Sequence, residues 1–231
     1  MDMATAADAI KVYLEIGKAR VLAGALDWPG WCRSGRDPDA ALEAVASYGP
    51  RYARVLRGSR LGFRAPANVR ALKVVEKLKG NATTDFGVPG LAPSADKRKA
   101  GEEDLRRFLA ILRACWRTFD AAVESAEGKK LRKGPRGGGR DLEKIVEHVL
   151  GAEAGYLASL GWKVESAEGS NPASLADRTR RSIAAGLQAS IRGEIAPRGP
   201  RGGVRWSARY FVRRAAWHLL DHAWEIEDRI L

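Results

Sequence analysis

The sequence predicts an α+β protein in two parts, a small N-terminal module of the ββαβ type followed by an up-down-up-down four-helix bundle. Apolar and polar residues alternate near the N-terminus, which is typical of a half-buried strand. In the second half, apolar residues recur at intervals of three and four, the period of an amphipathic helix. The intervening residues 81–101 are rich in Gly, Pro, Asn, Asp and Ser. We therefore expect a module at 1–80, a linker or surface-crossing loop at 81–101, and the bundle at 102–231.

The first part should begin with a β-hairpin and continue with a helix. Residues 10–16 alternate between apolar and polar side chains, Gly17-Lys18 suits a turn, and a second apolar stretch follows at 20–26. Asp37 can then cap a helix whose first residue is Pro38.

That helix should end or kink near Gly49-Pro50, because proline lacks a backbone N–H and clashes with the preceding turn. The next segment with a regular pattern is 71–78, which is compatible with a further strand or with a short helix. A strand there would complete the small module.

The order of these elements resembles a known small fold. Two strands lead into the segment DWPGWCRSGRD, residues 27–37, and then into a helix, as in the HicB-type ββαβ fold, and the likeness covers residues 9–80. The resemblance implies an interaction domain, since HicB-type antitoxins use this module to shield a toxin. The short DNA-binding C-terminal segment of those antitoxins is not found in this sequence. The alternative is a small sheet that packs on its neighbour and has no chemical role.

Four amphipathic helices are expected in the second part, at 102–123, 142–160, 174–191 and 207–230. Long connections separate them. Four helices of this length are the components of a four-helix bundle. In the expected up-down-up-down order, the second and the fourth helices run parallel.

All three histidines of the chain lie on these helices. His148 falls on the second helix, and His218 and His222 fall four residues apart on the fourth. Residues four apart share one helix face, with Cβ atoms roughly 5–6 Å apart, so two imidazoles can reach one cation. A third imidazole from another helix would complete a set that leaves coordination positions open, as in catalytic metal sites. The alternative is that these are hydrogen-bonded core residues near Trp217 and Trp224.

Two segments carry a second resemblance. The sequences KIVEHVLGAEAGYLASLGW, residues 144–162, and RRAAWHLLDHAWEIEDR, residues 213–229, resemble the DinB-like, or YfiT-like, metal-binding four-helix-bundle superfamily, and the likeness covers residues 102–231. In that superfamily one His of the second helix and an H-x-x-x-H pair of the fourth bind a divalent metal. The resemblance therefore implies the three histidines as ligands. Its better understood members resemble thiol S-transferases and mycothiol-dependent isomerases, and hydrolases are also represented.

The resemblance implies a divalent metal, zinc or nickel, and a low-molecular-weight thiol as cofactors. Three imidazoles suit iron and copper as well, so the residues alone do not name the metal. They leave the ion its positive charge, which lowers the pKa of a bound water or thiol toward neutrality. Glu225 shares the helix face of His218 and His222. It is the candidate catalytic carboxylate, which we expect to accept a hydrogen bond from an imidazole N–H or to shuttle a proton. Asp221 and Glu147 are the other candidates for this role.

The net charge of +12 indicates an affinity for anions. Both of the most basic stretches contain the sequence Gly-Pro-Arg-Gly-Gly, at 134–138 and at 199–203, and each precedes a histidine-bearing helix. If those helices are parallel, both loops lie at one end of the bundle, where glycine-rich segments before helix N-termini suit an anion. The alternative is two basic surface loops. On the first interpretation, four arginines bind the substrate at the mouth of the metal pocket: Arg136, Arg140, Arg201 and Arg205.

The composition argues against several classes of protein. The sequence has no run of about 18 apolar residues and no basic N-terminal region followed by a long apolar stretch, so we expect no membrane span, no signal peptide and a cytoplasmic location. Cys32 and Cys115 are far apart in sequence and suit two reduced thiols.

Together these features predict a metal-dependent enzyme, a thiol S-transferase or a hydrolase, that acts on a small anionic molecule. The alternative is a module that binds nucleic acid or a protein partner through its basic segments, with structural histidines and no catalytic activity. No nucleic-acid-binding motif supports that alternative. In a third interpretation, the HicB-like part docks a partner and the helical part is an inactive relative of the metal-binding superfamily. Bundles of that superfamily often pair, so a homodimer is one expected state.

Overall fold

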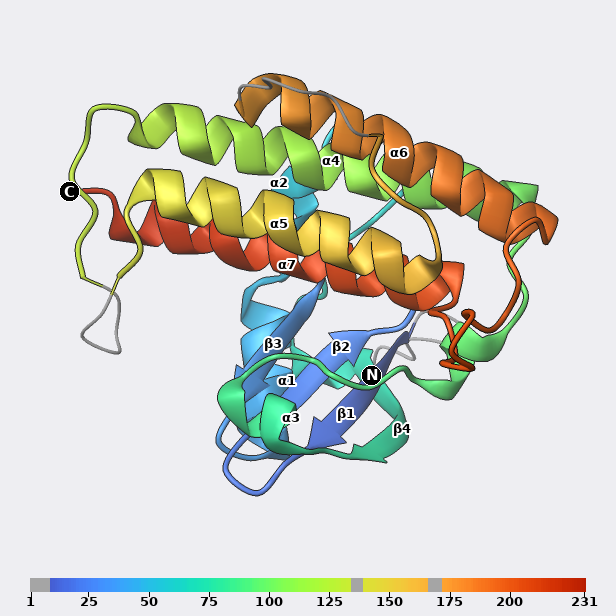
Figure 1. Ribbon diagram of the computed structural model, residues 1–231. Helices are drawn as coiled ribbons and strands as arrows, with labels where there is room; N and C mark the ends of the chain where they lie inside the picture. The colour runs from blue at the N-terminus through green and yellow to red at the C-terminus, as the bar shows by residue number, and fades with distance from the viewer. Residues whose placement is uncertain (1–8, 134–138, 166–171) are drawn as a thin grey trace. The chain divides into compact units, whose positions relative to one another are not determined.

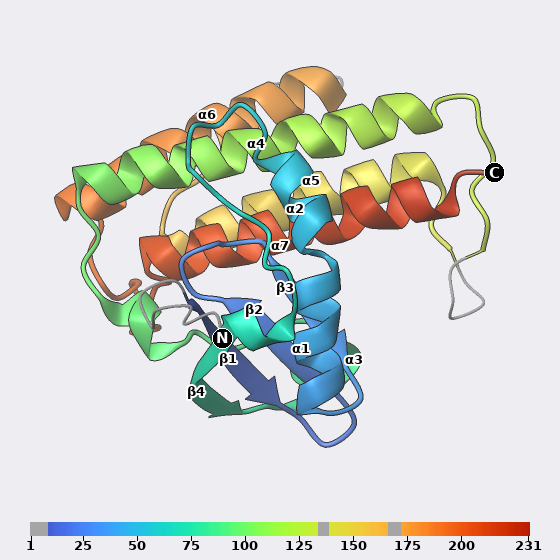
Figure 2. The same cartoon turned by 180° about the vertical axis from the view of Figure 1, so that it is seen from behind.

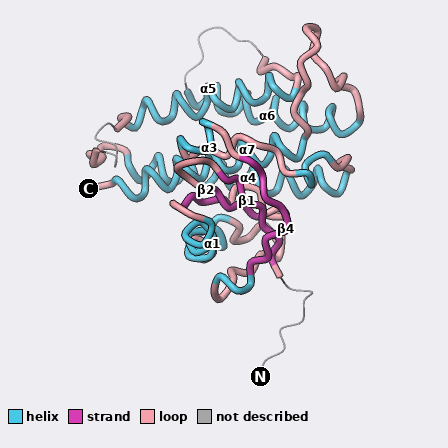
Figure 3. The backbone as a smooth tube through the Cα atoms, turned by 90° about the horizontal axis from the view of Figure 1, so that it is seen from below, coloured by secondary structure: helices cyan, strands magenta, loops and turns pink. Residues whose placement is uncertain are grey.

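The computed structural model describes residues 9–133, 139–165 and 172–231, and the chain divides into two compact units (Figure 1). The first unit is Met1–Arg98 and the second is Lys99–Leu231. The first contains a four-stranded sheet and the second contains four long helices, so the predicted α+β class is confirmed. All the strands coloured magenta in Figure 3 belong to the first unit. The division falls at Arg98, later in the chain than the predicted end of the module.

The sheet of the first unit has the strand order β3-β2-β1-β4. The predicted hairpin is present, because β1 (Ile10–Ile16) pairs antiparallel with β2 (Val21–Ala25). The ambiguous segment near residue 75 is a strand, β4 (Leu72–Lys79), which pairs parallel with β1. The sequence did not predict β3 (Cys32–Gly35), which pairs antiparallel with β2. Four residues are too few to give a clear alternating pattern.

Two short helices follow β3. α1 (Pro38–Ser47) begins after the predicted N-cap Asp37, whose carboxylate accepts a hydrogen bond from the Ala40 N–H at 2.8 Å. α2 (Gly49–Val55) follows directly and has Pro50 in its first turn, so the predicted break is confirmed. α1 packs against β2 and β3. A 3-10 turn, η1 (Val69–Ala71), then leads into β4.

The segment expected to be a linker or a surface-crossing loop is folded onto the sheet. It contains α3 (Ala82–Phe86) and a 3-10 turn, η2 (Ser94–Lys97). Glu15 of β1 is buried. Its carboxylate accepts hydrogen bonds from the Thr84 hydroxyl and from the N–H groups of Gly90 and Leu91. Such partners replace water around a buried carboxylate, and they attach this segment to the first unit.

The second unit contains the four helices that the sequence predicted. They are α4 (Glu102–Ala126), α5 (Leu142–Leu160), α6 (Pro172–Arg192) and α7 (Ala208–Arg229). Figures 1 and 2, seen from opposite sides, show the four helices lying side by side. Each carries a face of buried apolar side chains, which include Ile111, Leu112, Ile145, Leu157, Ile183, Leu187, Leu219 and Leu220.

The helix directions differ from the predicted order. Arg209 near the start of α7 forms an ion pair with Asp104 near the start of α4 at 2.6 Å, so these two helices run parallel. The Trp206 N–H, just before α7, donates to the Ser159 carbonyl at the end of α5 at 2.9 Å, so α5 and α7 run antiparallel. The expectation that the second and fourth helices are parallel is therefore wrong.

The direction of α6 follows from its contact with α4. Arg192 at the end of α6 lies 3.7 Å from Glu102 at the start of α4, so these helices are antiparallel and α6 runs in the direction of α5. The 11 residues between Leu160 and Pro172 can span about 36 Å when extended, more than the roughly 28 Å length of the 19-residue helix α5. The connection is thus long enough to return along the helix, and the up-down-up-down order was not required.

Candidate metal centre

The three histidines come together where α5 and α7 are in contact. His148 is the seventh residue of α5, and His218 and His222 are the eleventh and fifteenth residues of α7. Because the helices are antiparallel, the first part of α5 lies beside the last part of α7. One ring nitrogen from each histidine lies within 4.8 Å of the other two. The structure thus brings together the three side chains that the sequence predicted as ligands.

The separations within this cluster suit a shared ion. Nε2 of His148 and Nε2 of His218 are 3.1 Å apart. Two nitrogens bound to a tetrahedral zinc ion at about 2.0–2.1 Å are separated by about 3.3 Å. The ring centroids are 4.9, 5.0 and 4.6 Å apart, so all three rings surround one small volume. The same 3.1 Å separation also suits a single N–H···N hydrogen bond when no ion is bound.

Glu225 fixes the orientation of His222. Its Oε2 accepts a hydrogen bond from Nδ1 of His222 at 2.7 Å, which leaves Nε2 of that ring to bind an ion. Its Oε1 forms an ion pair with Nη1 of Arg229 at 2.6 Å. The hydrogen bond from His222 holds the pKa of Glu225 below its usual value. With both oxygens engaged, Glu225 suits the role of imidazole acceptor better than that of proton shuttle.

Burial favours the neutral form of two of the imidazoles. Burial lowers the pKa of His148 and lowers that of His218 to about 2, and nearby positive charge adds to both effects. Neutral imidazole is the form that binds a metal. Nδ1 of His218 is buried and, within the described residues, has no hydrogen-bond partner, in contrast to Nδ1 of His222. The donor set fits zinc, nickel, iron or copper.

Arg229 ties the end of α7 to the segment between α4 and α5. Its Nε donates to the Arg132 carbonyl at 2.7 Å, its Nη2 donates to the Arg140 carbonyl at 3.2 Å, and its Nη1 contacts Glu225. The Arg132 N–H donates in return to the Arg229 carbonyl at 2.8 Å. Arg229 was not predicted as a site residue. Its position four residues after Glu225, where a helix brings opposite charges together, was the available signal.

The Tyr156 ring packs against His218, and the Arg214 guanidinium packs against Tyr156. The Tyr156 ring lies 5.7 Å from the His218 ring, centroid to centroid, and the Tyr156 hydroxyl accepts a hydrogen bond from Nη2 of Arg214 at 3.1 Å. The Arg214 guanidinium lies 5.2 Å and 5.1 Å from the ring centroids of Tyr156 and Trp217, distances that suit cation–π contacts. Tyr156 and Arg214 were also missed, although spacings of eight from His148 and four from His218 place them on the histidine-bearing faces.

Of the four arginines of the predicted basic rim, the three described ones do not gather at one end of the helices. Arg136 lies outside the described residues. Arg140 directly precedes Asp141, the N-cap of α5. Arg205 is at the other end of α5, beside the C-cap Gly161, and donates to the Ala196 carbonyl at 3.0 Å. The exposed Arg201 belongs to the same loop as Arg205. The predicted placement of Arg201 and Arg205 is wrong because it assumed that α5 and α7 were parallel.

Glu147 lies next to His148 in sequence but faces another part of the unit. It lines a cavity of about 1180 Å³ between the end of α4 and the starts of α5 and α6, where Val123, Val146 and Leu175 supply apolar walls. None of the three histidines lines this cavity. Asp221 is half-buried on α7. The imidazole acceptor that the structure shows is Glu225.

Comparisons with protein-family models, with curated proteins and with solved structures found no match for this chain. Among the described helices, none has the length together with the apolar character that crossing a bilayer requires.

Proposed function

We propose that this protein is a divalent-metal-dependent enzyme of the thiol S-transferase or hydrolase type, which acts on a small molecule. The observation that carries the proposal is the convergence of imidazole nitrogens from His148, His218 and His222 within 4.8 Å. Among the described residues, no fourth His, Cys, Asp or Glu joins this group. Catalytic zinc sites keep a position open beside three protein ligands, whereas structural sites are closed by four.

In this proposal the surrounding residues position the ligands. A divalent ion supplies positive charge that lowers the pKa of a water or thiol bound at the site toward neutrality. Glu225 accepts a hydrogen bond from the Nδ1–H of His222, which fixes the ring and makes its Nε2 a stronger ligand for a metal ion. Arg229 keeps Glu225 ionised and in place. Tyr156 packs edge-to-face against His218 and restricts the orientation of that ring.

We further propose that α4, α5, α6 and α7 form a four-helix bundle of the DinB-like type, with α4 and α7 running one way and α5 and α6 the other. One histidine on the second helix and an H-x-x-x-H pair on the fourth are the ligand positions that the resemblance implies. Zinc or nickel, together with a low-molecular-weight thiol, are the cofactors proposed on this basis.

For the first unit we propose a HicB-like interaction module. The hairpin of β1 and β2, the helix α1 and the strand β4 follow one another in the order that the ββαβ resemblance implies. The short strand β3 and the segment up to Arg98 are additions to that order. The unit would bind a partner, while the second unit carries the chemistry.

The proposal is tested by activity that depends on both the metal and the histidines. The protein is stripped with a chelator, reloaded with zinc or nickel, and assayed for conjugation of glutathione with 1-chloro-2,4-dinitrobenzene and for hydrolysis of p-nitrophenyl acetate. We expect one of the two activities to return with the metal and to be absent from a His218→Ala, His222→Ala variant. If the reloaded protein binds the metal but shows neither activity, or if the variant is equally active, the enzymatic assignment is wrong.

A further inference from the structure

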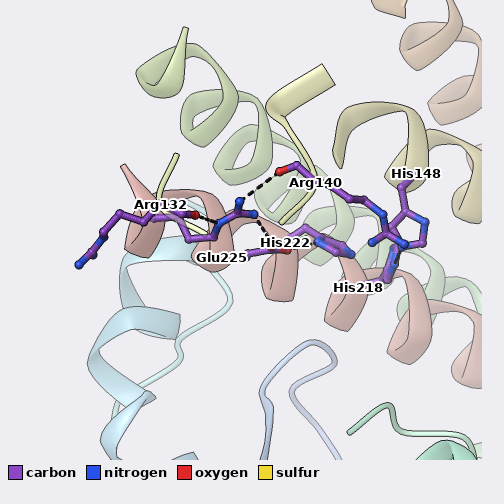
Figure 4. Close-up of polar contacts among 7 residues, drawn as sticks. Arg132, Arg140, His148, His218, His222 and Glu225 are labelled. Atoms are coloured by element: carbon purple, nitrogen blue, oxygen red, sulfur yellow. Dashed lines mark hydrogen bonds and ion pairs between the residues drawn. The ribbon is translucent and has the colours of Figure 1, made fainter. Parts of the chain in front are cut away.

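Arg140 belongs to the segment before α5, and its side chain extends toward the cluster of three histidines (Figure 4). Figure 4 shows this side chain extending from its backbone toward His148 and His218. Its positive charge is one of the causes that lower the pKa of both imidazoles, which agrees with this placement. Arg140 is exposed, so a ligand arriving from solvent can reach it.

The backbone of Arg140 is held at the cluster by a buried residue. The Arg140 carbonyl accepts a hydrogen bond from Nη2 of Arg229 at 3.2 Å, and the Nη1 of the same guanidinium holds Glu225 at 2.6 Å. Arg229 therefore fixes the backbone from which the Arg140 side chain extends. Because Glu225 orients His222, Arg229 also helps to fix the orientation of the His222 ring. A binding group is most effective when its supporting residues fix its position in this way.

Among the described residues, no acid supplies a counter-charge to the Arg140 guanidinium. Within the described part of the chain, no carboxylate forms an ion pair with it, whereas Arg229 and Arg209 each pair with an acid. Glu225, the carboxylate of the cluster, is already engaged by His222 and Arg229. Arg214 differs from Arg140, because it stacks on Tyr156 and Trp217 and bonds the Tyr156 hydroxyl.

A divalent ion held by the histidines would repel the guanidinium of Arg140, since like charges at short range are unfavourable. An anion that contacts both removes this repulsion. The planar fork of a guanidinium matches a pair of oxygens on a carboxylate or a phosphate. We infer that Arg140 and the ion bound by His148, His218 and His222 form a two-point site for an oxyanion group, a carboxylate or a phosphate, of the substrate. This inference rests on the metal site proposed above and names the substrate class of that site.

The test uses cobalt, whose visible absorption in the loaded protein reports both metal binding and changes in the ligands. The cobalt-loaded protein is titrated with acetate and, separately, with inorganic phosphate, in a buffer that does not coordinate the metal. We compare the wild type with Arg140→Gln and Arg140→Lys. Arg201→Gln is the matched control, because it removes one positive charge from an exposed loop at the other end of α5.

We expect all four proteins to take up one cobalt ion when the metal is saturating, since Arg140 contacts Arg229 through its carbonyl and is not a ligand. Arg140→Gln should weaken binding of the preferred anion about tenfold or more, because a charge-assisted hydrogen bond is lost, and Arg140→Lys should lie between it and the wild type. Arg201→Gln should match the wild type. Which of the two anions loses affinity identifies the group as carboxylate or phosphate.

Equal anion affinities in the wild type and Arg140→Gln, both with cobalt bound, would overturn the inference while leaving the metal site intact. The absence of any anion response in the cobalt-loaded wild type would overturn it in the same way. If the wild type binds no cobalt, the metal site itself is wrong and the inference falls with it. An equal loss of affinity in Arg201→Gln would show that the overall charge of the protein, and not this position, attracts the anion.

Discussion

The carboxylate of Glu225 accepts a hydrogen bond from Nδ1 of His222 at 2.7 Å, one turn along the same helix. Only Nε2 of that ring is then available to an ion. Since acceptors of this kind fix the tautomer and orientation of a ligand, we expect Glu225→Ala to weaken zinc binding about 10–100-fold without removing the site. Competition with a chelating dye at constant pH measures the dissociation constant.

The control for this change is Glu143→Ala, which removes an exposed carboxylate of α5 away from the rings. It should bind zinc like the wild type. If Glu225→Ala also retains the wild-type dissociation constant, the hydrogen bond to His222 has no part in metal binding.

A second prediction concerns Arg229. Its guanidinium satisfies two backbone carbonyls and one oxygen of Glu225, so Arg229→Met should lower the free energy of unfolding by roughly 2–3 kcal/mol and weaken zinc binding as well. Arg229→Lys retains a charge for Glu225 but not the fork, and should recover the affinity for zinc more than the stability. Urea unfolding and dye competition measure the two effects. Equal losses in both variants would contradict the separate roles assigned to the charge and the fork.

A third prediction concerns Glu153, a carboxyl group buried between α5 and α4. Its Oε1 accepts a hydrogen bond from the Trp116 indole N–H at 2.7 Å, and burial raises its pKa from an ordinary value of 4.5 to about 7. At a pH between these two pKa values, Glu153 has released its proton in the unfolded chain but keeps it in the folded chain. The contribution of Glu153 to stability is therefore complete below pH 4.5 and is lost as the pH rises through about 7. The loss amounts to about 3 kcal/mol of the free energy of unfolding.

Glu153→Gln keeps an oxygen for Trp116 but cannot ionise. Its free energy of unfolding, relative to the wild type, should therefore increase between pH 4.5 and pH 8, and the variant should be the more stable protein at pH 8. Urea unfolding at a series of pH values, with the two proteins side by side, gives this difference. Parallel curves for the two proteins would mean that Glu153 ionises normally in the folded state.

A fourth prediction tests the parallel packing of α5 and α6. A Cβ atom at Gly186 of α6 would lie 2.9 Å from Cγ of Trp162 and 3.0 Å from Cδ1 of Leu157, near the end of α5. We expect Gly186→Ala to lower the free energy of unfolding by about 1–3 kcal/mol, because Trp162 and Leu157 already fill the space that the added methyl group would need. At Gly155, a Cβ atom would meet nothing within 4 Å, so Gly155→Ala should raise stability by roughly 0.5–1 kcal/mol through helix propensity. Stabilisation by both changes would contradict this packing.

Much of the fold follows from local sequence patterns. The four long helices carry an apolar face over many turns, and the hairpin of β1 and β2 has a regular alternation, so both were predictable. The short strand β3 was missed because four residues carry little periodic information. The fold of the segment after residue 80 depends on its hydrogen bonds to Glu15, a residue more than 60 positions earlier in the chain, and local composition does not report such a contact.

The candidate site was predictable in part. Helical spacing identified His218, His222 and Glu225 as neighbours, because their separation depends only on the geometry of the helix that carries them. The position of Arg201 depended on the direction of a helix, which a long connection does not determine. The role of Arg229 depends on contacts with backbone carbonyls about 90 residues away, which no local pattern reveals.

The central claim is that the three histidines bind a divalent ion. The most direct measurement is elemental analysis of protein loaded with zinc or nickel and then freed of excess metal by gel filtration. The comparison includes wild type, His148→Ala, the His218→Ala, His222→Ala variant and the Glu143→Ala control. We predict about one ion per chain in the wild type and the control, and a large loss in both histidine variants. Equal metal content in all four proteins, or no retained metal in a folded wild type, would contradict the claim.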